Sequence, residues 1–230
     1  MRADVSERVE GVMKIVILNG SPRKECTHTA LQEAAAVFAD AGIDVDFVNL
    51  GTKPVRGCIA CEKCRTQKLG CCIFSDDLTN DLIERVAAAD AFLVGSPVYY
   101  AGMNGALKAV LDRMFYAAGH KFMYKPAAAL VSVRRAGATT AIDEILKYFT
   151  IYNMPVVTSC YWPMVHGEDA EQIFQDEEGV YTVRLLASNM VWMMKSLEAA
   201  RAAGIEVPHP TGRPMTNFID PRGDRRALDN

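Results

Sequence analysis

The amino-acid sequence predicts an α/β fold with a parallel sheet that helices cover on both faces. Short apolar segments alternate along the 230 residues with segments of helical periodicity. Most of the apolar segments are hydrophobic throughout, as strands buried on both faces are. Hydrophobic residues make up 50% of the chain and charged residues 23%, a composition typical of globular proteins.

The first strand, helix and strand can be placed from local patterns. Residues 13–18 form a β-branched run that ends at an Asn-Gly turn, which predicts a buried strand. Thr27 or Thr29 can cap the helix that follows, and an Ala-Gly pair at 41–42 ends it. Residues 43–50 alternate apolar and polar side chains, which favours a second strand.

A long irregular segment separates this unit from the rest of the domain. Residues 51–74 have neither helical nor strand periodicity, and loops of that length are usually functional or disordered. The elements expected after it are a helix capped by Asp76 and Asp77, a strand at 91–95, a helix with the apolar stripe Leu107, Val110, Leu111, Met114 and Phe115, a strand at 127–133, a helix at 141–151, a strand at 155–159 and a helix at 181–203.

These elements predict one domain at residues 13–204 with a Cys-rich loop at 51–76, between a polar lead-in at 1–12 and a Pro- and Arg-rich tail at 205–230. We expect no membrane segment, because no apolar run approaches the ~20 residues of a span. Acids precede the first apolar stretch and no small-residue cleavage site follows it, so we expect no secretory signal and a cytoplasmic protein. The 25 basic and 28 acidic residues nearly balance, which argues against a nucleic-acid partner.

The predicted carboxyl ends of the strands lead into four loops. In open parallel sheets, ligands bind outside these ends, near the point where the strand order reverses. The loops that we expect to form a site are therefore residues 20–29, 96–104, 133–140 and 160–167.

The first of these loops has the chemistry of a phosphate site. It joins a strand to a helix N-terminus, whose free amides attract anions. Hydroxyls on Ser21, Thr27 and Thr29, with Arg23 or Lys24, add further donors. The loop lacks the G-x-G-x-x-G and Walker patterns, so a monophosphate fits better than a dinucleotide or a nucleoside triphosphate. An ordinary capped turn is the alternative.

The other loops give weaker indications. Tyr99 and Tyr100 lie in a loop framed by proline and glycine, where they either flank a flat ring or pack within the protein. Arg134 and Arg135 follow a strand directly, where they either hold negative charge or are solvated. His166 lies in the last loop, and a lone histidine there is more often structural than catalytic.

Together these segments resemble the flavodoxin-like NAD(P)H-dependent FMN reductases, over about residues 13–200. The matching stretches are KIVILNGSPRK, DDLTNDLIERVAAADAFLVGSPVYYAGMNGALKAVLDR and RRAGATT. The resemblance implies a three-layer, doubly wound flavodoxin-like fold with a five-stranded parallel sheet and non-covalently bound FMN.

The resemblance also implies where FMN is held. The expected phosphate contacts are Ser21, Arg23, His28 and Thr29. The isoalloxazine would be bordered by Pro97, Val98, Tyr99 and Tyr100, with Gly102 near its edge, and its polar side closed by Arg134, Arg135 and Gly137. The chain reads S-P-R-K-E-C-T-H-T where the family usually reads S-P-R-K-x-G-N-T, one residue longer and without the Gly-Asn pair.

Five of the seven cysteines gather in the long loop, a local cluster that favours metal or redox chemistry over a disulfide scaffold. Four thiolates suit a [4Fe–4S] cluster, and the spacing resembles the iron–sulfur flavoproteins of the same superfamily. Zinc and free thiols without a cluster are the alternatives. The candidate ligands are Cys58, Cys61, Cys64 and either Cys71 or Cys72, of which Cys72 matches the family's usual last cysteine.

The function that the resemblance implies is an FMN-dependent NAD(P)H oxidoreductase. Electrons would pass from a nicotinamide through FMN to a quinone, an azo or nitro compound, or a flavin. Because the flavin carries this chemistry, no catalytic acid or base is predicted. The alternatives are an iron–sulfur flavoprotein that transfers electrons to a one-electron partner such as ferredoxin, and a flavin-free module with a zinc-held loop.

The resemblance further implies a homodimer or homotetramer. The candidates for an interface that also walls the flavin site are Met103, Met114, Phe115, Tyr116 and the Pro-rich tail. The alternative for most of these side chains is the core of the chain itself.

Overall fold

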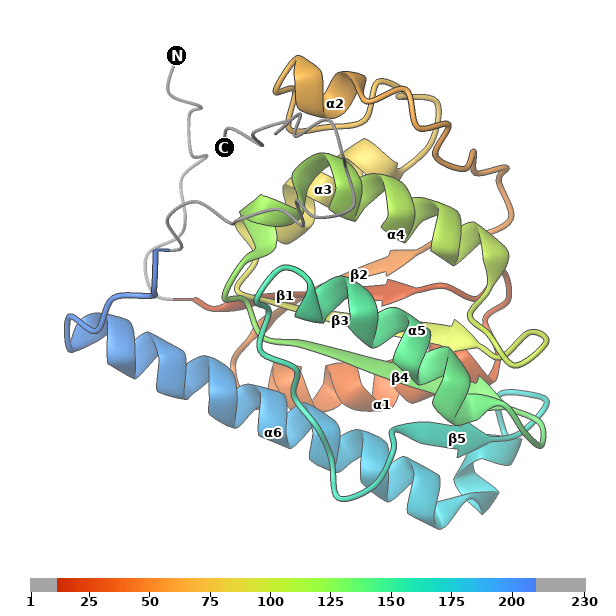
Figure 1. Ribbon diagram of the computed structural model, residues 1–230. Coiled ribbons are helices and arrows are strands. Elements are labelled where there is room, and N and C mark those ends of the chain that lie inside the picture. Colours follow the sequence, from red (N-terminus) through yellow and green to blue (C-terminus); the bar gives the residue numbers. More distant parts are fainter. Residues whose placement is uncertain (1–11, 210–230) are drawn as a thin grey trace, which may run out of the picture.

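A five-stranded parallel sheet runs through the computed structural model, which describes residues 12–209 (Figure 1). The strands pair in the order β2-β1-β3-β4-β5, so the order reverses between β1 and β3. This order confirms the predicted flavodoxin-like sheet. The strands are Lys14–Asn19 (β1), Asp44–Asn49 (β2), Ala91–Pro97 (β3), Ala127–Val133 (β4) and Met164–His166 (β5).

Helices cover both faces of the sheet and make three layers (Figure 1). Cys26–Asp40 (α1) and Glu177–Ala202 (α6) pack together on one face. Thr79–Ala88 (α3), Gly105–Ala118 (α4) and Ala138–Thr150 (α5) cover the other. The short helix Lys63–Thr66 (α2) lies outside α4, and 3-10 turns occupy Gly119–Phe122 and Gln172–Gln175.

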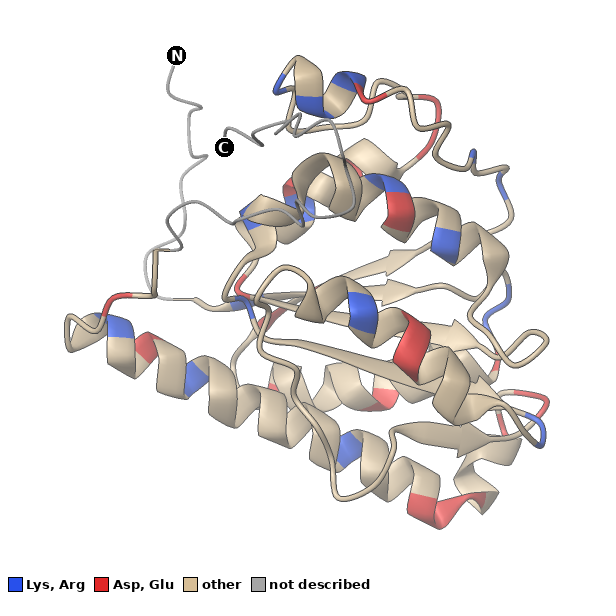
Figure 2. Cartoon of the chain, viewed as in Figure 1, with Lys and Arg blue, Asp and Glu red and all other residues tan. Residues whose placement is uncertain are grey.

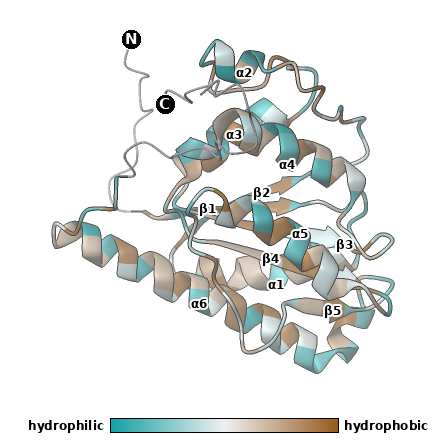
Figure 3. Ribbon diagram, in the orientation of Figure 1, coloured by the Kyte–Doolittle hydropathy of each residue, from teal (hydrophilic) through white to brown (hydrophobic). Residues whose placement is uncertain are grey.

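Alternating side chains of each central strand supply two separate cores. In β1, Val16 and Leu18 face α3 and α4, whereas Ile15 and Ile17 face α1 and α6. All four side chains are fully buried, which explains why the strand is hydrophobic throughout. The brown strands of Figure 3 show this apolar centre, and Figure 2 shows basic and acidic residues interspersed on the outer helices and loops.

The predicted strand at 155–159 is wrong. Val156 makes only an isolated bridge to Ala127, and the chain then leaves the sheet. The Ser159 hydroxyl donates to the Thr182 carbonyl (2.8 Å) instead of pairing with β4. The chain returns to the edge of the sheet at Pro163, whose carbonyl accepts from the Val131 amide (3.0 Å). The fifth strand is therefore β5, which follows directly.

The predicted threonine cap of the first helix is also wrong. Helix α1 begins at Cys26, so Thr27 and Thr29 lie inside its first turn and Glu25 takes the cap position. Of the two aspartates expected to cap α3, Asp77 does bond to its first residue: the Asp77 carboxylate accepts from the Thr79 amide (3.0 Å). Asp76 pairs instead with Arg56 (3.7 Å).

Three of the predicted interface residues belong to the core. Met103, Met114 and Phe115 are buried among α3, α4 and α5, whereas Tyr116 is 36% exposed. Residues 1–11 and 210–230, which include most of the predicted lead-in and tail, lie outside the described residues. None of the helices described is both long and apolar enough to cross a membrane.

Candidate functional site

A pocket lies at the carboxyl ends of β1, β3, β4 and β5, and we call it the strand-end pocket. It holds about 580 Å³ of empty space, including its open mouth. All four loops that the sequence pointed to contribute to it, which places the pocket at the switch in strand order. Its lining is Ser21, Arg23, Glu25, Cys26, Thr27, Pro97, Val98, Tyr99, Ser132, Arg134, Gly167 and Glu168.

The β1–α1 loop presents hydrogen-bond donors to this pocket. The Ser21 amide donates to the Asn19 side chain (3.0 Å), and the Ser21 hydroxyl accepts from the Arg23 amide (3.1 Å). The hydroxyl proton of Ser21 therefore stays available to an acceptor in the pocket. No side chain in the described part of the chain caps α1, so its first amides and its dipole can attract an anion.

The first turn of α1 is fixed against two other loops. The hydroxyls of Thr27 and Ser132 share a hydrogen bond of 2.7 Å, which ties α1 to the end of β4. The Cys26 thiol donates to the Asp169 carbonyl (2.7 Å). Burial raises the pKa of Cys26, with nearby Asp169 and Glu25 adding to the shift, so its thiol stays neutral and walls the pocket.

The loop after β3 forms a tight hairpin in which Tyr99 and Gly102 pair. Its two central residues, Tyr100 and Ala101, have positive φ angles of 50° and 61°, as in type I′ turns. The Glu144 carboxylate of α5 accepts from the Met103 amide (2.9 Å) and fixes the base of the hairpin. Tyr99 consequently lines the pocket, whereas Tyr100 is fully exposed.

The loop after β4 packs closely against that hairpin at a glycine. Gly137 has a φ angle of +91°, and a Cβ on it would lie 2.6 Å from the Ala101 Cα. Arg134 and Arg135, in the same loop, are both exposed, and of the two only Arg134 lines the pocket.

Gly137→Ala is expected to lower the free energy of unfolding by about 1–3 kcal/mol, because it combines backbone strain with a backbone clash. Gly42→Ala is the matched control, since Gly42 has a φ angle of +75° with nothing within 4 Å of the added Cβ. Urea titrations should show a larger loss for Gly137→Ala. Equal losses would mean that the contact with Ala101 contributes nothing.

Two residues expected to hold phosphate point elsewhere. His28 packs edge-on against Phe47, with ring centroids 5.1 Å apart, and burial lowers its pKa. The Thr29 hydroxyl donates to the Glu25 carbonyl (3.3 Å). Cys26 and Thr27 line the pocket instead. They lie in the part of the loop where this chain departs from the usual family sequence.

Beside the strand-end pocket, Asp176 joins β5 to α6. Its carboxylate accepts from the amides of Gly179 (2.9 Å) and His166 (2.7 Å) and lies 3.1 Å from the His166 ring. Burial raises the pKa of Asp176, but these hydrogen bonds outweigh it and hold the pKa below its usual value.

The lowered pKa of Asp176 predicts an acid-dependent loss of stability. A carboxyl whose folded pKa is depressed stabilises the protein above its unfolded pKa, and that contribution is lost as pH falls through the folded pKa. We expect the free energy of unfolding to fall below about pH 4, and to fall less in Asp176→Asn, which keeps a capping side chain but no titrating group. Urea titrations from pH 2 to 7 check this, with the exposed Asp143→Asn as control. A fall as large in Asp176→Asn as in the wild type would contradict it.

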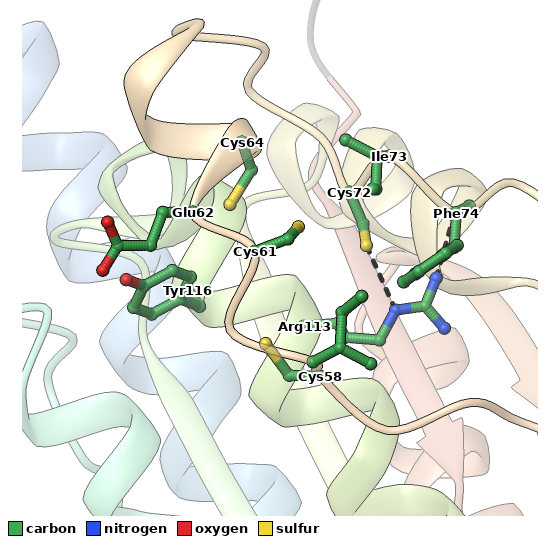
Figure 4. Close-up of a pocket in the computed structure, with 10 residues that line it drawn as sticks. Cys58, Cys61, Glu62, Cys64, Cys72, Ile73, Phe74, Arg113 and Tyr116 are labelled. Carbon is green, nitrogen blue, oxygen red and sulfur yellow. Dashed lines mark hydrogen bonds between the residues drawn. The ribbon is translucent and has the colours of Figure 1, made fainter.

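A second pocket, which we call the thiol pocket, lies between the Cys-rich loop and α4 (Figure 4). It holds about 330 Å³ of empty space, including open solvent. Cys71 is not part of its wall, and within residues 12–209 none of the seven cysteines forms a disulfide. The lining is Cys58, Ile59, Cys61, Glu62, Cys64, Cys72, Ile73, Phe74, Arg113 and Tyr116.

The four thiols of this pocket influence one another. Burial raises the pKa of Cys64, and the neighbouring thiols of Cys72, Cys61 and Cys58 raise it further. Four thiolates would repel each other unless a cation bound them. In residues 12–209, no three Cys, His, Asp or Glu side chains are positioned to hold a single metal ion. A [4Fe–4S] cluster binds each thiolate to a different iron, so its ligands stand farther apart, and the donor set fits it.

Arg113 of α4 bonds to several residues of the Cys-rich loop. Its side chain is fully buried and pairs with Asp77. It also donates to the carbonyls of Phe74 (2.9 Å) and Arg56 (3.2 Å) and to the Cys72 sulfur (3.2 Å). Sequence reasoning missed this residue; its signal was a charge directly beside the apolar stripe of the helix, since buried charges are rare unless paired.

Comparisons with known proteins identify relatives of this chain. The family model described as NADPH-dependent FMN reductase matches residues 13–169. An iron-sulfur flavoprotein of Methanocaldococcus jannaschii is 31% identical over 195 residues, covering 81% of this chain and 100% of the relative. An iron-sulfur flavoprotein of Methanosarcina thermophila is 29% identical over 195 residues, covering 82% and 99%.

Solved structures share the fold at low identity. A flavodoxin from the domain Archaea superposes with a TM-score of 0.54 at 14% identity, covering 80% of this chain and 99% of that one. The flavoenzyme NAD(P)H:(acceptor) oxidoreductase FerB of Paracoccus denitrificans superposes with a TM-score of 0.56 at 17% identity, covering 80% and 98%. Both similarities concern the arrangement of strands and helices alone.

Proposed function

The chain belongs to the NADPH-dependent FMN reductase family, and we propose that it is an oxidoreductase that passes electrons from a nicotinamide through FMN to an acceptor. The observation that carries the proposal is the strand-end pocket, which combines an uncapped helix N-terminus, a free hydroxyl proton and two arginines at the switch in strand order. FMN, when bound, supplies the hydride chemistry. We propose quinones, azo or nitro compounds, or free flavin as acceptors.

The phosphate end of FMN is assigned to the β1–α1 loop. Ser21 offers its hydroxyl proton, Arg23 its charge, and the first turn of α1 its amides, which Cys26 and Thr27 present to the pocket. His28 and Thr29 remain predictions from the family resemblance, and their present contacts point away from this role.

The flavin ring is assigned to the other side of the pocket. Pro97, Val98 and Tyr99 form an apolar edge, and Arg134 places a cation beside it. Reduced flavin is anionic at its N1–O2 edge, so Arg134 would stabilise the reduced state. Predicted contacts from the neighbouring turns, which lie outside the pocket lining, are Tyr100, Gly102, Arg135 and Gly137.

The thiol pocket favours a second function, electron transfer to a one-electron partner such as ferredoxin. The assigned ligands of a [4Fe–4S] cluster are Cys58, Cys61, Cys64 and Cys72, because these four thiols line one pocket. When bound, FMN would supply two-electron chemistry and the cluster one-electron transfer. By family resemblance we propose a cytoplasmic homodimer or homotetramer, which sedimentation of the holoprotein would measure.

One experiment separates these functions. Protein purified without oxygen should show yellow flavin absorption, and FMN should be released on denaturation. Adding NADPH or NADH should bleach the flavin bands, and a quinone should restore them. Additional brown cluster absorption, bleached on reduction and restored by oxidised ferredoxin, would favour the electron-transfer function. A colourless protein that binds no added FMN would contradict both.

A further inference from the structure

We propose that Arg113 is a positioning residue of the thiol pocket that sets the reduction potential of the cluster through an N–H···S hydrogen bond to Cys72. This inference rests on the proposed cluster at Cys58, Cys61, Cys64 and Cys72. It adds a group that binds no iron itself and acts through one of the ligands.

The orientation of the guanidinium group supports this role. Its two terminal nitrogens are held by Asp77 and by the carbonyls of Phe74 and Arg56. These bonds fix the plane of the group, so Nε–H points at the Cys72 sulfur, 3.2 Å away (Figure 4). The Arg113 side chain is fully buried, which keeps water from competing for its Nε–H.

The hydrogen bond distinguishes Cys72 from the other pocket thiols. Within residues 12–209, Cys72 is the pocket thiol that accepts a hydrogen bond from a charged side chain. The same guanidinium holds the backbone on both sides of the cysteines, at Arg56 and at Phe74. It therefore positions the fourth ligand relative to the C-x-x-C-x-x-C segment.

The hydrogen bond has a defined electrostatic effect. A reduced cluster carries one more negative charge than an oxidised one, and its ligand sulfurs are better hydrogen-bond acceptors. A donor aimed at sulfur stabilises the reduced form more and raises the reduction potential. Asp77 offsets the charge of Arg113 at a distance but does not accept the Nε–H, so the local bond to sulfur remains.

The test compares anaerobically purified wild type with Arg113→Lys and Arg56→Lys. Lysine keeps the positive charge and can pair with Asp77, but it lacks a donor at the Nε position. Arg56→Lys is the matched control, since the Arg56 guanidinium lies over the same Phe74 ring (4.5 Å) without being bonded to a thiol. Iron, sulfide and FMN contents are measured first, and a redox titration followed by electron paramagnetic resonance then gives the cluster potential.

Arg113→Lys should keep FMN and shift the cluster potential to a more negative value, by a roughly tenfold change in the one-electron equilibrium, about 59 mV. Arg56→Lys should match the wild type. If Arg113→Lys fails to fold, the wild type decides: the Fe–S(Cys) stretching bands of its cluster should shift after full exchange into D2O, because the Nε–H that bonds to the Cys72 sulfur becomes Nε–D.

Three outcomes have distinct meanings. A full cluster at an unchanged potential in Arg113→Lys overturns the inference while leaving the proposed cluster intact. Fe–S(Cys) bands that do not shift in D2O do the same when the arginine variant does not fold. Wild-type protein that takes up no iron and sulfide on anaerobic reconstitution overturns the cluster itself, and the inference with it.

Discussion

Cys72→Ser is expected to remove iron and sulfide from the anaerobically purified protein, whereas Cys71→Ser should keep about four of each per chain. The two cysteines are adjacent in sequence, but only the Cys72 side chain lines the thiol pocket with Cys58, Cys61 and Cys64. A serine hydroxyl is a poor substitute for thiolate sulfur on iron. Iron and sulfide assays of both variants, prepared in parallel, check the expectation.

The FMN content provides the internal control for this pair. The strand-end pocket shares no lining residue with the thiol pocket, so Cys72→Ser should retain wild-type flavin. Loss of flavin together with iron would indicate that the variant has unfolded rather than lost a ligand. The reverse pattern, with iron lost in Cys71→Ser and retained in Cys72→Ser, would contradict the assignment.

Local patterns predicted most of the sheet because its strands are buried on both faces. Residues 127–133 match β4 at both ends, since every side chain of that strand is buried. The segment at 155–159 has similar apolar character, and its sequence does not show that Ser159 bonds to α6 rather than to β4. Whether such a segment joins the sheet depends on which distant residues it bonds to. That choice leaves no hydrophobic periodicity in the local sequence.

The sequence predicted which loops form the strand-end pocket better than which side chains line it. Parallel topology brings all strand ends to one edge, so four loops could be named from the order of elements alone. Which side chains enter the pocket depends on where α1 begins. The helix begins at Cys26, so Cys26 and Thr27 line the pocket and His28 lies against Phe47.

The thiol pocket shows a different limit. The spacing of the cysteines favoured a cluster and left the fourth ligand open between Cys71 and Cys72, of which Cys72 matches the family's usual last cysteine. In the structure only Cys72 of the two lines the pocket, where it accepts from Arg113, which lies 41 residues from Cys72 and 36 from Asp77 in sequence. A buried charge next to an apolar stripe signals that a partner exists without identifying it.

Ser21→Ala is expected to weaken FMN binding by roughly tenfold to a hundredfold, because it removes a hydroxyl donor worth about 1.5–3 kcal/mol to a charged phosphate. The Ser21 hydroxyl already accepts from the Arg23 amide, so its proton is the part available to the ligand. Titration of apoprotein with FMN, followed by flavin fluorescence, measures the change.

Thr29→Ala is the matched control for this prediction, since it removes a hydroxyl of the same loop that donates to the Glu25 carbonyl and lies outside the pocket. Its FMN affinity should stay within about threefold of the wild type, because no bond to the ligand is lost. Equal weakening in both variants would mean that α1 starts differently when flavin binds and that Thr29 takes the role that the family resemblance implies. Unchanged affinity in Ser21→Ala would place the phosphate away from the β1–α1 loop altogether.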